Sequence, residues 1–267
     1  MKLQFWQKAL PVKMWLIEPV RVFRTLAMTA VSMLVTGIGS PKVFAIGLNK
    51  TATTSLHHIF VELGYRSYHG TAWRDTSRWL IFQHYDAFSD GPPEDFIRLD
   101  RRFPGSKFIL QVRNLDDWID SRLEHIRRLP HRRGRGKDWA ISEDAIRAWV
   151  ARRDRHHAGV LRYFQHRQGD LLVLNYIRDP QSAARVCAFL GKPVCAQKPH
   201  SNPDPAAKPP GGTALKNPEM IARALTSLGI PEAAWKNDLQ STDPALPGDT
   251  GNLGPAGSSL ADASRIA

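Results

Sequence analysis

The stretch from Lys42 to Tyr65 constrains the fold of this chain more than any other. An apolar, β-prone run at residues 43–46 ends at Gly47, and apolar residues then recur at helical spacing until Gly64: Leu56, Ile59, Phe60 and Leu63. The stretch therefore predicts a strand, a loop and a helix. Together with the apolar strand-like runs at 107–112 and 171–174, it predicts an α/β fold with a central parallel sheet.

The loop between this strand and helix, GLNKTATTS at residues 47–55, contains one lysine and a run of hydroxyl residues. Backbone N–H groups at the helix start, the positive end of the helix dipole and the ammonium of Lys50 would converge there, which favours a tetrahedral anion. The ATP-type pattern G-x-x-x-x-G-K-[ST] is not matched, because Lys50 precedes the hydroxyl run and no glycine stands directly before it. The alternative is an ordinary turn whose Thr and Ser side chains cap the helix.

A second strand end carries another candidate for phosphate binding. The run 107–112 ends at Arg113, and Ser121 follows two turns into the next predicted helix. Ligands of open α/β sheets sit at the carboxyl ends of the strands, so we expect Arg113 and the Lys50 loop to face one crevice. The fork of an arginine suits paired phosphate oxygens. The alternative is a surface ion pair between Arg113 and Asp116 or Asp117.

The loop resembles the 5′-phosphosulfate loop of sulfotransferases that use 3′-phosphoadenosine 5′-phosphosulfate (PAPS), whose usual form is K-T/S-G-T-T-S/W-L. Residues 50–56, KTATTSL, fit at every place except Ala52, where the family has glycine. A left-handed backbone there would cost an alanine roughly 1 to 2 kcal/mol. Arg113 with Ser121 resembles the family's site for the donor's 3′-phosphate. Tyr176, after the strand 171–174, resembles the tyrosine near the adenine, with core packing as its alternative.

The resemblance covers residues 42–202 and is closest to the bacterial and fungal-type branch, which has D-A-F-S-D-x-P before the arginine strand. It implies a three-layer sandwich like that of P-loop nucleotide hydrolases, and sulfuryl transfer from PAPS to a hydroxyl or amine without a metal. The implied acceptor is a small molecule, a glycan or a lipid. The residues it implies for binding the donor are Asn49, Lys50, Thr51, Ala52, Thr53, Thr54, Ser55, Arg113, Ser121 and Tyr176.

The implied catalytic residues are Lys50, His69 and Asp90. Lys50 would neutralise charge on the oxygen that leaves sulfur, and a base must accept the acceptor's proton. His69 ends the predicted strand 66–70 and would titrate near neutrality. Asp90 lies in the D-x-P stretch, where a helix cap before Pro92 is its alternative. His84 is a weaker candidate, and the choice of base stays open between His69 and Asp90.

Composition limits the partners. The net charge is +12, and from Pro203 onward seven acidic residues stand against five basic ones, so residues 1–202 carry about +14, which predicts an anionic partner for the folded part. The sequence contains no zinc-finger spacing and no RNP-type motif, so a nucleic-acid partner is not expected. Cys187 and Cys195 are expected to be reduced thiols. The basic run 122–137 is expected to be a solvated loop, with a docking patch for an acidic acceptor or lipid as the alternative.

Three regions are predicted: an extension at 1–40, an α/β domain at 41–202, and a Pro/Gly/Ala-rich, partly disordered extension at 203–267. Residues 1–40 mix basic and aromatic side chains, which leaves open a helix at a membrane surface or one packed on the domain. We expect a cytoplasmic protein, with peripheral membrane contact through 1–40 as the alternative. A P-loop kinase and a non-catalytic basic protein that binds membranes or anions are the competing functions.

Overall fold

The structure is a computed structural model that describes residues 39–129, 139–193 and 215–239. These residues fall into two compact units. The first, here the sheet unit, contains the described residues 39–111 and 164–193. The second, the helical unit, contains 112–129, 139–163 and 215–239. The predicted extension at 1–40 lies almost wholly outside the described residues, as does much of 203–267.

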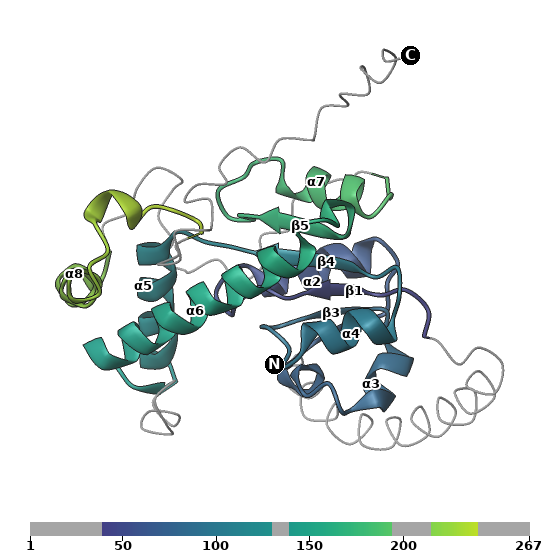
Figure 1. The fold of residues 1–267 in the computed structure, drawn as a ribbon, viewed down its shortest axis with the longest axis horizontal. Helices are drawn as coiled ribbons and strands as arrows, with labels where there is room; N and C mark the ends of the chain where they lie inside the picture. Colours follow the sequence, from purple (N-terminus) through teal and green to yellow (C-terminus); the bar gives the residue numbers. More distant parts are fainter. Residues whose placement is uncertain (1–38, 130–138, 194–214, 240–267) are drawn as a thin grey trace, which may run out of the picture. The chain divides into compact units, whose positions relative to one another are not determined.

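A five-stranded parallel sheet forms the centre of the sheet unit (Figure 1). Its strands are β1 (Val43–Ala45), β2 (Ser67–His69), β3 (Ala87–Ser89), β4 (Lys107–Gln111) and β5 (Leu171–Leu174), in the order β2-β3-β1-β4-β5. Every paired neighbour runs parallel. The carboxyl ends of all five strands therefore meet at one edge, and the predicted α/β class with a central parallel sheet is confirmed.

One face of this sheet is covered by α2 (Thr53–Glu62) and α7 (Ser182–Phe189). Alternate strand residues point to this face, and they pack with apolar side chains of both helices in one buried cluster. Its members include Val43, Ala45, Leu56, Ile59, Phe60, Ile109, Val186 and Cys187. Cys187 is thus buried and forms no disulfide, which agrees with the predicted reduced thiol.

The other face carries an aromatic core. Phe44 of β1 lies 5.4 Å from Phe88 and 5.3 Å from Phe108 between ring centroids, because these residues are partners in the ladder. Rings from η1 (Thr71–Arg74), from α3 (Trp79–His84), from the residue after α4 (Phe96–Arg102) and from the last residue of α6 (Glu143–Phe164) complete it: Trp73, Phe82, Phe103 and Phe164. Helices on both faces make this unit three layers.

The sequence predictions were wrong in detail around this core. Strand β3 was not predicted, because three residues between turn residues carry too little periodicity. The prolines at 92 and 93 would suit the start of a helix over 94–103, but α4 does not start on them. It begins at Phe96, because the side chain of Asp95 caps it by accepting from the backbone N–H of Arg98 at 2.8 Å.

The helical unit consists of α5 (Leu115–Arg127), α6 (Glu143–Phe164), α8 (Pro218–Ser227) and the short η5 (Glu232–Ala234). Phe164, at the end of α6, belongs to the sheet unit, as does the short turn η4 (Gln168–Asp170). The side chain of Ser142 accepts from the N–H of Ala145 at 3.2 Å and so caps α6. The basic run 122–137 was expected to be a loop, but α5 continues to Arg127 because Leu123 and Ile126 extend its buried face.

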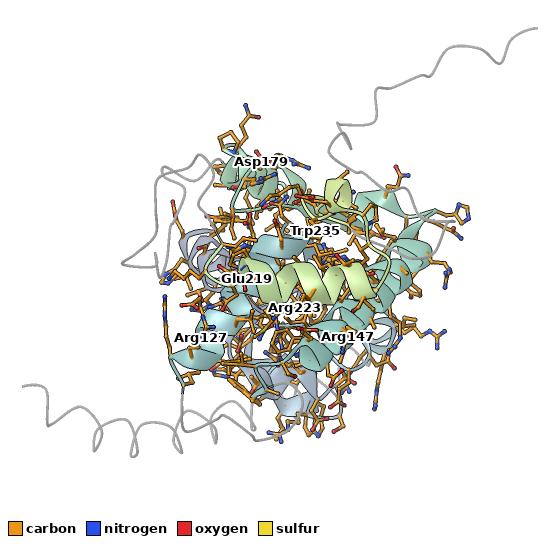
Figure 2. The ribbon with its side chains drawn as sticks, turned by 90° about the vertical axis from the view of Figure 1, so that its left-hand side faces the viewer. Arg127, Arg147, Asp179, Glu219, Arg223 and Trp235 are labelled. Carbon is orange, nitrogen blue, oxygen red and sulfur yellow. The ribbon has the colours of Figure 1, made fainter. Side chains whose placement is uncertain are left out.

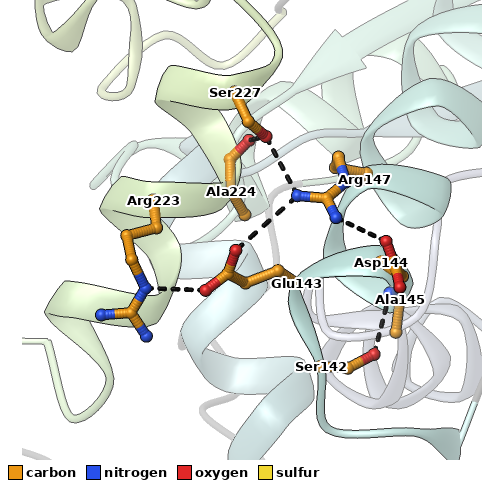
Figure 3. A network of polar contacts seen from close by, with 8 residues as sticks. All are labelled: Ser142, Glu143, Asp144, Ala145, Arg147, Arg223, Ala224 and Ser227. Carbon is orange, nitrogen blue, oxygen red and sulfur yellow. Dashed lines mark hydrogen bonds and ion pairs between the residues drawn. The ribbon is translucent and has the colours of Figure 1, made fainter.

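Polar contacts join α8 to α6 (Figure 3). Nε of Arg223 lies 2.7 Å from a carboxylate oxygen of Glu143, and Nη1 of Arg147 donates to Oγ of Ser227 at 3.0 Å. Figure 2 shows Glu219 and Arg223 on α8, where they form an ion pair of 3.9 Å. Residues 215–239, which the sequence assigns to a C-terminal extension, are therefore an integral part of the helical unit.

Candidate functional site

The loop that follows β1 is held closely against β4. The backbone N–H of Gly47 donates to Oε1 of Gln111 at 2.5 Å. A Cβ at position 47 would collide with the backbone and side chain of Gln111, so only glycine fits there. The hydroxyl of Thr51 donates to the carbonyl oxygen of Leu48 at 2.5 Å and closes the loop on itself.

Two residues of this loop have a left-handed backbone. Both Lys50 and Ala52 have φ of 69°, whereas Thr51 between them is not among the positive-φ residues. This alternation is the geometry with which successive N–H groups form an anion-binding concavity. Ala52 therefore does adopt a left-handed backbone, and it bears a strain of roughly 1 to 2 kcal/mol.

Ala52 is also the N-cap residue of α2, where no side chain accepts a hydrogen bond. The first turn contains no acidic residue, and it carries Thr53, Thr54 and Ser55. The positive end of the helix dipole therefore coincides with the left-handed loop and with the ammonium-bearing Lys50. Asn49 and Lys50 are partly exposed, whereas Thr51 and Thr53 are buried.

His69, at the end of β2, lies next to this helix start. Nε2 of its ring is 3.2 Å from Oγ1 of Thr54, and Nδ1 is 2.9 Å from Oγ of Ser89. The second contact follows from the ladder, which pairs His69 with Ser89 in parallel register. The structure thus joins one candidate base to the candidate anion loop through a single hydroxyl.

The surroundings of His69 favour its neutral form. Burial lowers its pKa below the ordinary value, the charge of Asp90 opposes this shift, and the charges of His58 and Arg74 add to it. The ring of His57 lies 5.4 Å from that of His69, and burial lowers the pKa of His57 too, followed by the charges of His69 and His58. An imidazole that is neutral at pH 7 can accept a proton.

Asp90 follows β3 with φ of 96°, a left-handed backbone that is uncommon for aspartate. Its carbonyl oxygen accepts from Nε of Arg74 at 2.6 Å, and one carboxylate oxygen lies 3.5 Å from Nη2 of the same arginine. The predicted alternative role, a helix cap before Pro92, does not apply, because Asp95 caps the next helix. His84 lies at the end of α3 with its ring 4.5 Å from that of Tyr85.

Arg113 and Ser121 belong to the helical unit. Arg113 is half-buried, and burial lowers its pKa, whereas the charges of Asp117, Asp120 and Asp116 raise it. Ser121 is partly exposed in the second turn of α5. The alternative of an ion pair at Arg113 is thus an interaction with several carboxylates of α5 rather than with one.

The N-terminus of α5 has backbone acceptors. The N–H groups of Leu115 and Asp116 donate to the carbonyl oxygens of Asn237 and Trp235, each at 3.2 Å. Nζ of Lys236 lies 2.6 Å from a carboxylate oxygen of Asp116. A phosphate bound here would therefore contact side chains such as Arg113 and Ser121 rather than these two N–H groups.

Tyr176 is 1% exposed and belongs to the buried cluster under α2 and α7. Its surroundings agree with the packing alternative. The residues that sequence reasoning missed are those around the candidate base: Trp73, Arg74 and Ser89. The Asp90-Gly91 pair after a buried run is a turn signal that pointed to this region.

A family model of the sulfotransferase domain matches residues 74–151. This part of the chain is similar to sulfotransferase domains. The match agrees with the resemblance to sulfotransferases drawn from the sequence, and it supports a sulfuryl-transfer activity in general. The match covers less than a third of the chain and includes Asp90, Arg113 and Ser121. It begins after the Lys50 loop and after His69, so it includes neither.

Among curated proteins, no significant match to the chain is found. In the part of the chain that the structure describes, no three His, Cys, Asp or Glu side chains are grouped so that they could hold a metal ion. None of the described helices is long and apolar enough to cross a membrane.

Proposed function

We propose that the chain transfers a sulfuryl group from PAPS to a hydroxyl or amine of a small-molecule, glycan or lipid acceptor. The observation that carries the proposal is the left-handed backbone at Lys50 and Ala52, directly before a helix whose N-cap is an alanine. That combination offers backbone N–H groups, a helix dipole and one ammonium to an anion.

Within this proposal, the loop holds the 5′-phosphosulfate. Its members are Asn49, Lys50, Thr51, Ala52, Thr53, Thr54 and Ser55. The assignment of Arg113 and Ser121 to the 3′-phosphate is a separate proposal, supported by the family match over both residues. Tyr176 remains a prediction for the adenine, which its burial does not favour.

The transfer itself breaks one bond and forms another. The acceptor oxygen or nitrogen bonds to sulfur, while the bond from sulfur to the bridging oxygen breaks and leaves its electron pair on the phosphate of 3′-phosphoadenosine 5′-phosphate (PAP). Lys50 stabilises that developing negative charge, an electrostatic contribution worth a few kcal/mol per good donor. The acceptor's proton passes to the base, for which we propose His69.

His69 is preferred to Asp90 because of its contacts. Its Nε2 lies beside Thr54 of the anion loop, whereas a carboxylate oxygen of Asp90 lies 3.5 Å from Nη2 of Arg74 and is engaged in that ion pair. Asp90 instead raises the pKa of His69 and would stabilise the imidazolium that forms during transfer.

Calorimetric titration with PAP tests the proposal before any acceptor is known. We expect binding that requires the 3′-phosphate, with 5′-AMP as the matched ligand and ATP as the competing one. Lys50→Ala and Arg113→Ala should each weaken binding of PAP at least tenfold, whereas the exposed Lys192→Ala and Arg155→Ala should not. A preference for ATP would support a kinase instead, and no nucleotide binding would reject the loop assignment.

Acceptors can then be screened with radiolabelled PAPS. The competing membrane hypothesis rests on residues 1–40 and on the basic run, of which 1–38 and 130–138 lie outside the described residues. It predicts that deletion of 1–40 removes binding to anionic liposomes and leaves PAP binding unaffected.

A further inference from the structure

The turn that follows β3 has an unusual backbone at two successive residues. Asp90 has φ of 96° and Gly91 has φ of 97°. Glycine tolerates this conformation, whereas it is uncommon for an aspartate. The turn lies directly after Ser89, whose hydroxyl contacts Nδ1 of His69 at 2.9 Å.

The side chain of Arg74 binds this turn through several contacts. Its Nε and Nη2 both donate to the carbonyl oxygen of Asp90, the former at 2.6 Å, and Nη2 lies 3.5 Å from the carboxylate. The guanidinium also fills the space beside Gly91, where an added Cβ would lie 2.7 Å from Nη2 and 2.8 Å from Cζ. One planar group thus binds the backbone and side chain of Asp90 and excludes a side chain at 91.

Arg74 is itself fixed by its neighbours. The backbone N–H of Glu94 donates to the carbonyl oxygen of Arg74 at 2.8 Å. The adjacent Trp73 is fully buried in the aromatic core, and its indole N–H donates to the carbonyl oxygen of Ser89 at 2.7 Å. Two consecutive residues of η1, Trp73 and Arg74, therefore donate hydrogen bonds to the carbonyl oxygens of the consecutive residues Ser89 and Asp90.

We propose that Arg74 is a positioning residue for the base. By holding the turn 89–91, it presents the hydroxyl of Ser89 and the carboxylate of Asp90 to His69 in one fixed arrangement. Ser89 then selects one tautomer of the neutral imidazole, which determines the role of Nε2 beside Thr54. This inference rests on the proposed function, since only there is His69 the base.

The charges around His69 come from three elements. Asp90, after β3, raises the pKa of His69; Arg74 of η1 and His58 of α2 lower it; and His57 of α2 stacks on the ring. Loss of Arg74 removes a positive charge and also releases the carboxylate of Asp90 from its ion pair. The pKa of His69 alone therefore does not show whether the ring is still held in position. The tautomer equilibrium of His69 does show this, because it depends on which of the hydroxyls of Ser89 and Thr54 donates to the ring and which accepts from it.

Nitrogen NMR of ¹⁵N-histidine-labelled protein at pH 8 tests the proposal. The signals of His69 are assigned from their loss in His69→Asn. We expect one dominant neutral tautomer in the natural chain, and at least a threefold rise of the minor tautomer in Arg74→Gln. Arg74→Lys keeps the charge but not the fork, and it should also raise the minor tautomer. Arg78→Gln is the matched control, because Arg78 pairs with Asp75 on the surface.

Unchanged tautomers in folded Arg74→Gln would overturn the proposal, as would an equal change in Arg78→Gln. If Arg74→Gln does not fold, Arg74→Lys is judged by the same criterion. In a transfer assay, Arg74→Lys should lower kcat about tenfold and leave KM for PAPS unchanged. PAP binding to the natural chain tests the proposed function separately, so a failure there is distinguishable from a failure of the Arg74 assignment.

Discussion

Asp120 of α5 accepts two hydrogen bonds from Asn217, one from the backbone N–H at 3.0 Å and one from the side-chain amide at 2.7 Å. The backbone N–H of Lys216 donates to the same carboxylate at 3.1 Å. The start of α8 is therefore capped by a side chain from a different helix, far away in sequence. The sequence composition assigned the segment before α8 to a C-terminal extension. These hydrogen bonds link it to α5, the helix that carries Ser121.

Replacement of Asp120 should loosen α8. We expect Asp120→Ala to lower the free energy of unfolding by about 1 to 2 kcal/mol, the usual cost of losing a cap or a charge-assisted hydrogen bond. Asp120→Asn retains an acceptor and should cost less than half as much. Urea unfolding followed by tryptophan fluorescence measures both. If the two variants were equally stable, the charge rather than the hydrogen bonds would be the source of the effect.

The left-handed backbone at Ala52 predicts a stabilising substitution. Ala52→Gly should remove roughly 1 to 2 kcal/mol of strain, of which about half is offset by the greater freedom of glycine in the unfolded chain. We expect the free energy of unfolding to rise by about 0.5 to 1 kcal/mol. Ala188→Gly, at an exposed position in α7, is the matched control and should lower it by up to about 1 kcal/mol. A loss of stability in Ala52→Gly would contradict the strain at this position.

His157 in α6 predicts how stability depends on pH. It is 2% exposed, and neither ring nitrogen has a hydrogen-bond partner. Burial lowers its pKa well below the ordinary value, and the charges of Arg153 and His156 add to this. The unfolded chain thus binds a proton near pH 6.5 that the folded chain does not, so stability is full above that pH and falls below it, by at most about 1.4 kcal/mol per pH unit from this group.

A variant without the imidazole should lose this dependence. His157→Leu replaces two unsatisfied polar atoms with an apolar group of similar volume, and we expect it to stabilise the protein by about 1 kcal/mol at pH 7. The gain should grow as the pH falls from 6.5 to 5. Thermal unfolding at pH 5, 6, 7 and 8 measures it, with His166→Leu at an exposed position as the control. A gain that did not depend on pH would contradict the assignment of the acid sensitivity to His157.

The sequence predicted the parts of the molecule that depend on local pattern. The loop between β1 and α2 was found because Lys50 and the hydroxyl run stand between a four-residue apolar run and a helical repeat. Strand β3 was missed because its three residues are buried by neighbours on both sides rather than marked by their own spacing.

The base could not be chosen from sequence, because its chemistry depends on tertiary contacts. His69 acquires its partners from α2, β3 and η1, and a fork contact between Arg74 and Asp90, sixteen residues apart, leaves no periodic signal. Likewise, the carbonyl groups of Trp235 and Asn237 at the start of α5 come from more than a hundred residues away. Such contacts were accessible only from the folded structure.

Asp90→Asn distinguishes the two candidate bases. Asp90 raises the pKa of His69, so its neutralisation should lower that pKa and move the acid limb of kcat/KM to lower pH, with kcat above the limb within a few-fold of the natural chain. If Asp90 were itself the base, the same variant would lose roughly a hundredfold or more at every pH. Sulfuryl transfer from PAPS to a screened acceptor between pH 5 and 9 separates these outcomes. Asp170→Asn, which removes a surface ion pair with Lys107 in the same unit, is the control and should leave the profile unchanged.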